Sequence, residues 1–110
     1  MRKIESLMCQ AVSNNQDWRL ANTEVQYDAD TNTSAVYLHG NLIATVTDND
    51  MTIYDGGWQS NTTKSRLNAI LDMFGATGER VYQRAYQWYV RVNNNGTQHD
   101  VPFVNGFTFA

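Results

Sequence analysis

The chain of 110 residues is 42% hydrophobic and 12% aromatic, which is enough for one packed core and too little for two. Its formal net charge is −3, whereas a non-specific nucleic-acid binder normally carries a strong excess of Lys and Arg. Residues 56–110 hold five basic and three acidic side chains, so a local basic patch is compatible with the sequence. Apolar runs are only a few residues long, so we expect no membrane span. The only cysteine, Cys9, excludes an internal disulfide and indicates a reducing compartment.

Residues 2–14 are expected to form a short helix with one apolar face. The apolar residues that recur at helical spacing are Ile4, Leu7, Met8, Ala11 and Val12. Cys9 lies beside this stripe, which predicts a small buried thiol. Such a helix packs on a sheet or binds a partner, and the sequence leaves both interpretations open.

An antiparallel meander of about four strands is expected to follow. Its first strand covers residues 18–27, with a break near Asn22. Gly40-Asn41 predicts a two-residue hairpin turn that sets Leu38 across from Ile43. Both faces of that hairpin carry apolar groups, so we expect it to be covered on both sides. Residues 51–54 form the fourth strand, and Gly56-Gly57 then releases the chain from the sheet.

Residues 62–74 are predicted to form the second helix. Its apolar residues fall at positions i, i+3, i+4 and i+7: Leu67, Ile70, Leu71 and Phe74. Asn61 and Thr62 are the preferred N-caps, and Gly75 stands where a left-handed C-cap residue is common.

The C-terminal third is expected to be extended chain. Residues 80–92 form one bent strand or two short ones. Asn95-Gly96 predicts a type I′ turn that pairs Arg91 with Asp100. Pro102 indicates an edge strand, because proline cannot donate a ladder hydrogen bond. A last turn at Asn105-Gly106 precedes residues 107–109.

These elements predict an α+β fold in a single domain over residues 1–110. An antiparallel sheet, made of the meander of about four strands plus a C-terminal hairpin, is packed by the N-terminal helix and one central helix.

Two segments resemble a known group of proteins. VYLHGNLIA (36–44) and GWQSNTTKSRLNAIL (57–71), with WYV (88–90) downstream, are similar to segments of small uncharacterised proteins of tailed bacteriophages, including marine ones. The resemblance covers about residues 18–92. The resemblance implies a phage origin and a host-cell cytoplasmic setting. It does not imply an active site.

The residues that an enzyme needs are not arranged in any familiar pattern. His39 and His99 are far apart and have no metal-ligand neighbours at a standard spacing. Asp48 and Asp50 are expected to be turn residues. No nucleophile elbow, phosphate-binding loop or dinucleotide fingerprint occurs. We therefore expect a protein that is not an enzyme and has no cofactor or bound metal.

The start of the second helix is the best candidate contact site. Hydroxyls, free backbone N–H groups and two cations crowd there at the positive end of the helix dipole. With the neighbouring tryptophan and two downstream arginines, the candidate residues are Trp58, Thr62, Thr63, Lys64, Ser65, Arg66, Arg80 and Arg84. Ordinary N-capping with a solvated helix face explains the same residues, and the alternatives remain open. We expect Lys64→Ala with Arg66→Ala to leave the fold nearly intact, because surface substitutions usually cost little stability. Unfolding of this double variant would mean that the cluster is structural and not a contact site.

The function expected from the sequence is macromolecular binding in the host cytoplasm. The first choice of partner is a protein or a second copy of the chain, including a homodimer, because an aromatic-rich sheet with an edge strand can dock or dimerise. The acidic net charge favours this interpretation over DNA binding. The second choice is nucleic acid, bound at Thr62 to Arg66 with Arg80 and Arg84 and with aromatic residues from Tyr82 to Tyr89.

Overall fold

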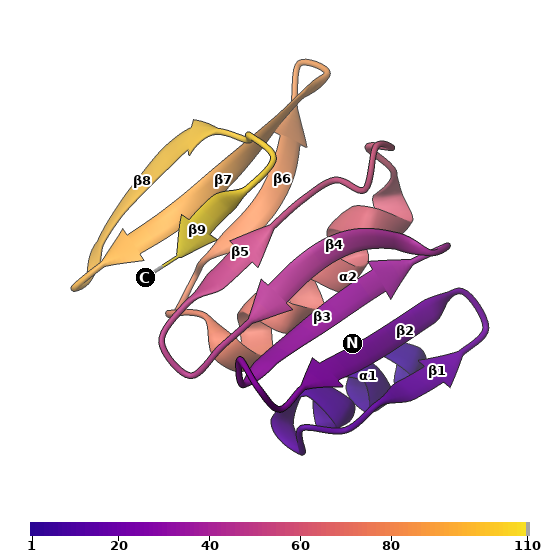
Figure 1. The fold of residues 1–110 in the computed structure, drawn as a ribbon. Coiled ribbons are helices and arrows are strands. Elements are labelled where there is room, and N and C mark those ends of the chain that lie inside the picture. Colours follow the sequence, from indigo (N-terminus) through magenta and orange to yellow (C-terminus); the bar gives the residue numbers. More distant parts are fainter. Residues whose placement is uncertain (110) are drawn as a thin grey trace.

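The computed structural model describes residues 1–109 and contains two helices and nine strands in that range. In chain order they are α1 (Lys3–Ser13), β1 (Trp18–Leu20), β2 (Thr23–Asp28), β3 (Thr33–Leu38), β4 (Asn41–Val46), β5 (Met51–Ile53), α2 (Asn61–Phe74), β6 (Arg80–Arg84), β7 (Gln87–Asn94), β8 (Thr97–Pro102) and β9 (Phe107–Phe109). Six strands form one sheet in the order β1-β2-β3-β4-β5-β9, and β6-β7-β8 form a second one (Figure 1). All neighbouring strands are antiparallel, so the predicted α+β class is confirmed.

Both helices lie against one face of the six-stranded sheet (Figure 1). On that face the central row of the sheet is buried: Val25, Val36, Ala44 and Ile53 are aligned neighbours with no exposed surface. The row beside it faces away from the helices and consists of Gln26, Ala35, Thr45, Thr52 and Thr108. These residues are half-buried or exposed. The prediction that the β3–β4 hairpin is covered on both sides is therefore wrong.

The two helices and both sheets share one cluster of buried side chains. In α2, Leu67, Ile70 and Leu71 are buried as predicted. In α1 the buried face is rotated from the predicted stripe, because Glu5 is buried while Ile4 and Leu7 are half-buried. The members of that face are Glu5, Met8, Cys9, Ala11 and Val12. The predicted burial of Cys9 is confirmed, and its thiol donates a hydrogen bond to the carbonyl oxygen of Ala69 at 3.6 Å.

The C-terminal hairpin has the predicted register. Asn95 and Gly96 have positive φ angles of 51° and 90°, and Arg91 lies opposite Asp100. Pro102 lies in β8, which is an edge strand of its sheet, as predicted.

One other hairpin turn differs from the prediction, and another selects one of the two alternatives that the sequence left open. The β3–β4 turn is His39-Gly40, with Leu38 opposite Asn41, and not Gly40-Asn41. A bulge then places Val36 opposite Ala44, which brings the buried residues of both strands back to one face. Residues 80–92 form two strands joined at Ala85-Tyr86, where both φ angles are positive although neither residue is glycine.

The segment 18–27 is a hairpin, because β1 pairs antiparallel with β2. The break predicted near Asn22 is confirmed as its turn, so the meander has five consecutive strands. The turn at residues 105–106 also forms, and β9 then pairs with β5. This last pairing joins segments more than 50 residues apart, which local sequence patterns do not encode.

The ends of α2 correct the predicted caps. The N-cap is Ser60, whose hydroxyl oxygen accepts a hydrogen bond from the Thr63 N–H at 3.1 Å, and not Asn61 or Thr62. Gly75 ends the helix with extended backbone (φ −85°), and not with the predicted left-handed conformation. Its lack of a side chain has another reason: a Cβ there would lie 2.8 Å from the carbonyl oxygen of Leu71.

Candidate functional site

The candidate residues at the start of α2 point in different directions. Thr63 is buried, and its hydroxyl lies 2.9 Å from that of the N-cap Ser60. Ser65 and Arg66 face α1, whereas the Lys64 ammonium donates a hydrogen bond toward Gln83 of β6. Thr62 is half-buried and lines a separate pocket. The structure therefore does not gather these side chains into one contact surface.

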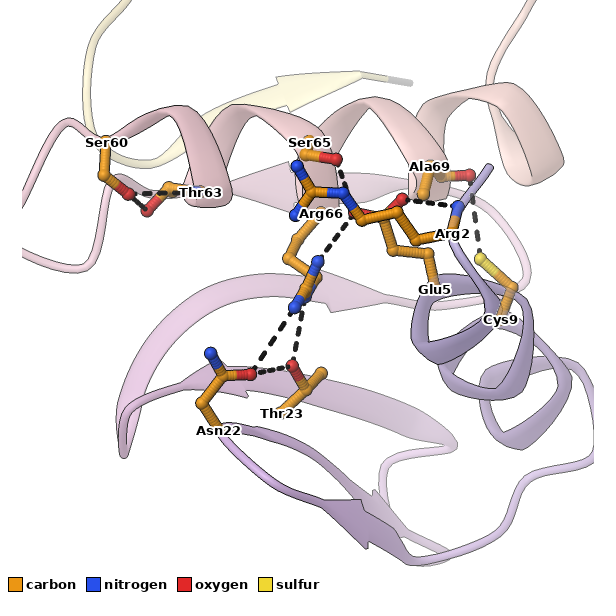
Figure 2. Close-up of polar contacts among 10 residues, drawn as sticks. All are labelled: Arg2, Glu5, Cys9, Asn22, Thr23, Ser60, Thr63, Ser65, Arg66 and Ala69. Atoms are coloured by element: carbon orange, nitrogen blue, oxygen red, sulfur yellow. Dashed lines mark hydrogen bonds and ion pairs between the residues drawn. The ribbon is translucent and has the colours of Figure 1, made fainter.

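Arg66 is the centre of a buried network that joins three elements. Only 4% of its side chain is exposed, and it forms an ion pair with Glu5 of α1 at 2.8 Å. Its Nε donates to the Thr23 hydroxyl at 3.0 Å, and a second terminal nitrogen donates to Asn22. Figure 2 shows these contacts running from α2 to α1 and to the start of β2. Arg66 thus holds the helices and the sheet together.

Glu5 is satisfied on both carboxylate oxygens. Oε2 accepts hydrogen bonds from Ser65 at 2.6 Å and from Arg66, and Oε1 accepts from the backbone N–H of Arg2 at 3.2 Å. Burial alone would raise the pKa of Glu5, but the hydrogen bonds from Ser65 and Arg66 more than offset it and leave the pKa below its usual value. The carboxylate is therefore charged at neutral pH, which the buried guanidinium requires.

The expected indifference of the fold to Lys64→Ala with Arg66→Ala is incompatible with this network. Removing Arg66 would leave the Glu5 carboxylate buried without its counter-charge, which is among the costlier single changes in a protein. Arg66 also cannot meet a phosphate from solvent without first leaving Glu5. Of the predicted site residues, Ser65 and Arg66 therefore have a structural role.

Lys64 lies in the angle between α2 and the three-stranded sheet. Its ammonium is 5.8 Å from the ring centre of Trp88, which is buried. Asn68, one turn further on, binds both backbone groups of Val81, donating to the carbonyl and accepting from the N–H. A shallow groove between α2 and β6 is lined by residues that include Lys64, Arg80 and Tyr82. Lys64 and Arg80 thus line one groove, whereas Arg66 does not belong to its lining.

The face of the three-stranded sheet that points away from the core carries aromatic and cationic side chains. We call it the tyrosine–arginine face and define it by six of the residues that the strand register places on this side: Arg80, Tyr82, Arg84, Tyr89, Arg91 and Asp100. Tyr82 and Tyr89 lie opposite each other with stacked rings whose centres are 5.7 Å apart. The guanidinium of Arg84 is 4.9 Å from the ring centre of Tyr89, and that of Arg91 is 5.4 Å from that of Tyr82. Cation–π contacts thus hold this face together.

Asp100 is the single acidic side chain of the tyrosine–arginine face. It accepts two hydrogen bonds from Arg91, at 2.9 and 3.1 Å, and one from the Tyr82 hydroxyl at 2.5 Å. The hydrogen bonds from Arg91, and then that from Tyr82, lower the pKa of Asp100 to about 2. The same bond to Asp100 raises the pKa of Tyr82. Arg80 and Arg84 take part in no ion pair within residues 1–109, so their charge remains available to a partner.

Two large aromatic side chains project into solvent. Tyr86 is 96% exposed at the turn between β6 and β7, next to Arg84. Trp58 is 75% exposed and borders a pocket of about 420 Å³ between the β3–β4 turn and the start of α2. Both rings are accessible to a partner, and aromatic residues are enriched at protein interfaces.

The sequence pattern identified only part of the tyrosine–arginine face. Arg80, Arg84 and the aromatic residues from Tyr82 to Tyr89 were candidates, whereas Arg91 was expected only to pair with Asp100, a pairing that the structure confirms. The hairpin turn at Ala85-Tyr86 is what brings Tyr82 opposite Tyr89, and it carries neither glycine nor asparagine. Arg and Tyr occupy alternate positions in both strands. Once the position of the turn is known, this alternation indicates that these side chains share one face of the sheet.

Within residues 1–109, no three side chains of the His, Cys, Asp or Glu type lie close enough to hold a metal ion. In the same range no helix is long and apolar enough to cross a membrane. Burial raises the pKa of the Cys9 thiol to about 11, with smaller contributions from the charges of Glu5 and Asp72. The thiol is therefore protonated and unreactive at neutral pH.

The chain matches no curated protein sequence and no solved structure. It does match a protein family over its whole length, residues 1–110. This match bears out the phage origin that the segments at 36–44 and 57–71 implied. The chain belongs to the Kyanoviridae Gp96 protein family, a family of phage proteins.

Proposed function

We propose that this phage protein is a non-enzymatic binding module that acts in the host cytoplasm by contact with another protein. The tyrosine–arginine face is the contact surface, with Tyr86 at its end. The observation that carries the proposal is the concentration of Tyr and Arg on one outward sheet face beside a tyrosine that is 96% exposed. Tyrosine and arginine are enriched at protein interfaces and dominate their binding energy.

The charge of this face indicates the kind of partner. Three arginines and one aspartate give it a formal charge of +2 in a chain whose net charge is −3. An acidic protein surface is therefore the complementary partner, and electrostatic steering will make association faster at low salt.

Single-stranded nucleic acid is the second candidate for the same face. Stacked aromatic rings beside arginines are typical of surfaces that bind single strands. Two features favour a protein over a nucleic acid. The rings of Tyr82 and Tyr89 already stack on each other, and Asp100 places a carboxylate among the arginines, where it would repel phosphates.

The test compares two matched double variants in affinity capture from infected host cells. Arg84→Ala with Tyr86→Ala removes one charge and one exposed aromatic ring from the tyrosine–arginine face. Arg19→Ala with Leu20→Ala removes one charge and one exposed apolar side chain from β1, at the far edge of the other sheet. We expect the first variant to lose a partner that the wild type and the second variant retain, and the purified partner to bind more weakly as salt increases. Equal capture by both variants would contradict the proposal.

Fluorescence polarisation distinguishes the second candidate. Labelled single-stranded DNA and RNA, with duplexes as a comparison, are titrated with the wild-type protein at low salt. Binding that Arg84→Ala with Tyr86→Ala weakens would favour nucleic acid. Absence of binding at low salt would remove that candidate and leave the protein partner.

A further inference from the structure

β8 has a long strand edge that no other described segment covers. It is the outermost strand of its sheet (Figure 1), and five of its six residues are exposed. The two edges of the other sheet, β1 and β9, have only three residues each. The remaining edge, β6, is blocked at Val81, because the Asn68 side chain binds both of its backbone groups. Among residues 1–109, β8 is therefore the edge best suited to strand pairing.

The register identifies which backbone groups of β8 point outward. The two-residue turn at 95–96 is closed by Asn94 and Thr97, so Thr97, His99 and Val101 exchange hydrogen bonds with β7. The N–H and C=O groups of Gln98 and Asp100 then point away from the sheet. No described residue donates to or accepts from them. Two donors and two acceptors thus stand at the spacing that another antiparallel strand presents.

We propose that a second copy of this chain pairs with β8 across a two-fold axis and joins the two three-stranded sheets into one of six strands. The axis passes beside His99, so that Gln98 of each copy lies opposite Asp100 of the other. Each such pair exchanges two backbone hydrogen bonds, and all four outward groups of each copy are satisfied. A two-fold interface needs a surface that is complementary to itself, and this edge has that property.

Charge disfavours one of the two neighbouring registers. A shift of two residues would place Asp100 opposite Asp100 of the other copy, where like charges repel. It would also place Gln98 opposite Pro102, which has no N–H to donate. In the proposed register Asp100 faces an uncharged amide, and its own charge is already paired with Arg91. The charge that usually keeps an edge strand from pairing is therefore largely compensated within the monomer.

The first test removes one outward N–H group without changing the rest of the strand. Gln98→Pro deletes the donor, and proline is tolerated at an edge position whose N–H faces solvent. Gln98→Ala is the matched control, because both variants lose the side-chain contact from Gln98 to the Thr77 carbonyl but only the control keeps the N–H. In analytical ultracentrifugation the wild type and the control should dimerise alike. Gln98→Pro should raise the dimer dissociation constant roughly tenfold or more, since two hydrogen bonds are lost per dimer.

The second test reads the register directly and does not depend on the proline variant folding. In a pair that shares no hydrogen bonds the Cα atoms are close enough for a disulfide, so His99→Cys should cross-link two copies on oxidation. Thr97→Cys lies on the same strand and face but far from the axis, and should not cross-link. The wild type controls for Cys9, which is 1% exposed. A wild type that is monomeric at about 1 mM, or cross-linking that is equal at both positions, would overturn the proposal.

The proposed dimer and the proposed function can be refuted independently of each other. Gln98→Pro weakens the proposed dimer and His99→Cys cross-links it, and both variants leave Arg84 and Tyr86 unchanged. Partner capture can therefore be measured separately from dimerisation. Arg84→Ala with Tyr86→Ala leaves the outer edge of β8 unchanged, and that variant should dimerise like the wild type.

Discussion

At the scale of single residues, the pair of Arg66 and Glu5 sets the strongest constraint on the structure. Both side chains are almost fully buried, and every nitrogen that Arg66 presents to the network has an acceptor. No buried side-chain nitrogen or oxygen among residues 1–109 lacks a hydrogen-bond partner. A buried ion pair adds little net stability when complete, but removing one partner is costly because the other keeps its charge without compensation.

Arg66→Ala should therefore lower the free energy of unfolding by about 3–5 kcal/mol, because it leaves the Glu5 carboxylate buried and unpaired. Lys64→Ala is the matched neighbour on the same helix. Lys64→Ala should lower the free energy of unfolding by roughly 1 kcal/mol or less, since the Lys64 ammonium makes only an exposed hydrogen bond and a distant contact with Trp88. Urea unfolding followed by tryptophan fluorescence gives both values.

Replacing both partners by uncharged side chains separates charge from packing. Glu5→Gln with Arg66→Met should be considerably less destabilising than Arg66→Ala alone, because no uncompensated charge remains buried. Similar, small losses for Arg66→Ala and Lys64→Ala would mean that the network contributes little and that the helix start is a solvated cap.

The inward position of Arg66 has a sequence signal that helical periodicity alone obscures. Arg66 lies four residues before Ile70, on the buried side of α2, and Glu5 lies three before Met8, on the buried side of α1. Opposite charges on the apolar faces of two helices indicate an interhelical pair. The predicted stripe contained Met8, Ala11 and Val12, which are buried, but it omitted Glu5. Only the packing of α1 against α2 brings Glu5 and Arg66, which are 61 residues apart, together.

At the scale of elements, the capping of α2 follows from where the chain leaves the six-stranded sheet. The Trp58 carbonyl accepts a hydrogen bond from the Thr63 hydroxyl, which fixes the loop against the first turn. Ser60 is thereby the residue whose side chain faces the free N–H of Thr63. Asn61 and Thr62 have equally suitable side chains, so residue type alone did not identify the cap.

Ser60→Ala should destabilise the protein by about 1 kcal/mol, the usual cost of losing an N-cap acceptor. Asn61→Ala should have almost no effect, because its side chain makes no capping bond. Thermal unfolding of the two variants decides between the positions. A larger loss at Asn61 than at Ser60 would contradict the observed cap.

The hairpins show which parts of the fold local sequence can predict. Asn95-Gly96 combines two residues that favour positive φ, so its register was predictable. At Ala85-Tyr86 ordinary residues adopt the same angles because flanking strands and core packing impose them. At the β3–β4 turn the strand pairing is shifted by one residue from the predicted register, and a bulge at Ile43 compensates for this shift. The alternation of apolar and polar side chains does not reveal such a bulge. The tyrosine–arginine face depends on the second of these turns and was identified only in part.

At the scale of the whole molecule, charge is separated in space. The β2–β3 and β4–β5 turns lie side by side, joined by a hydrogen bond from Asn32 to Asp48. The acidic residues at these turns are Asp28, Asp30, Asp48 and Asp50, and the cations Arg80, Arg84 and Arg91 lie on the other sheet. The net charge of −3 therefore hides a basic face, which the overall composition does not reveal.

Acid should unfold the protein through two carboxylates in different layers. The pKa of Glu5 is lowered and that of Asp100 is lowered to about 2, so both bind protons more readily when the chain is unfolded. Their stabilisation is complete above the unfolded values of about 4, and it is lost as the pH falls through the lower folded values. The free energy of unfolding should thus be constant near neutrality and decrease from about pH 5 toward pH 2.

Two variants assign this loss to its source. Glu5→Gln with Arg66→Met removes the buried carboxylate, so its stability should depend less on pH in the acid range than that of the wild type. Asp100→Asn should change the slope less, because the pair with Arg91 is exposed to solvent and screened. Urea unfolding at a series of pH values measures both slopes. If the double variant kept the full acid dependence of the wild type, the buried pair would not be the source of the loss of stability in acid.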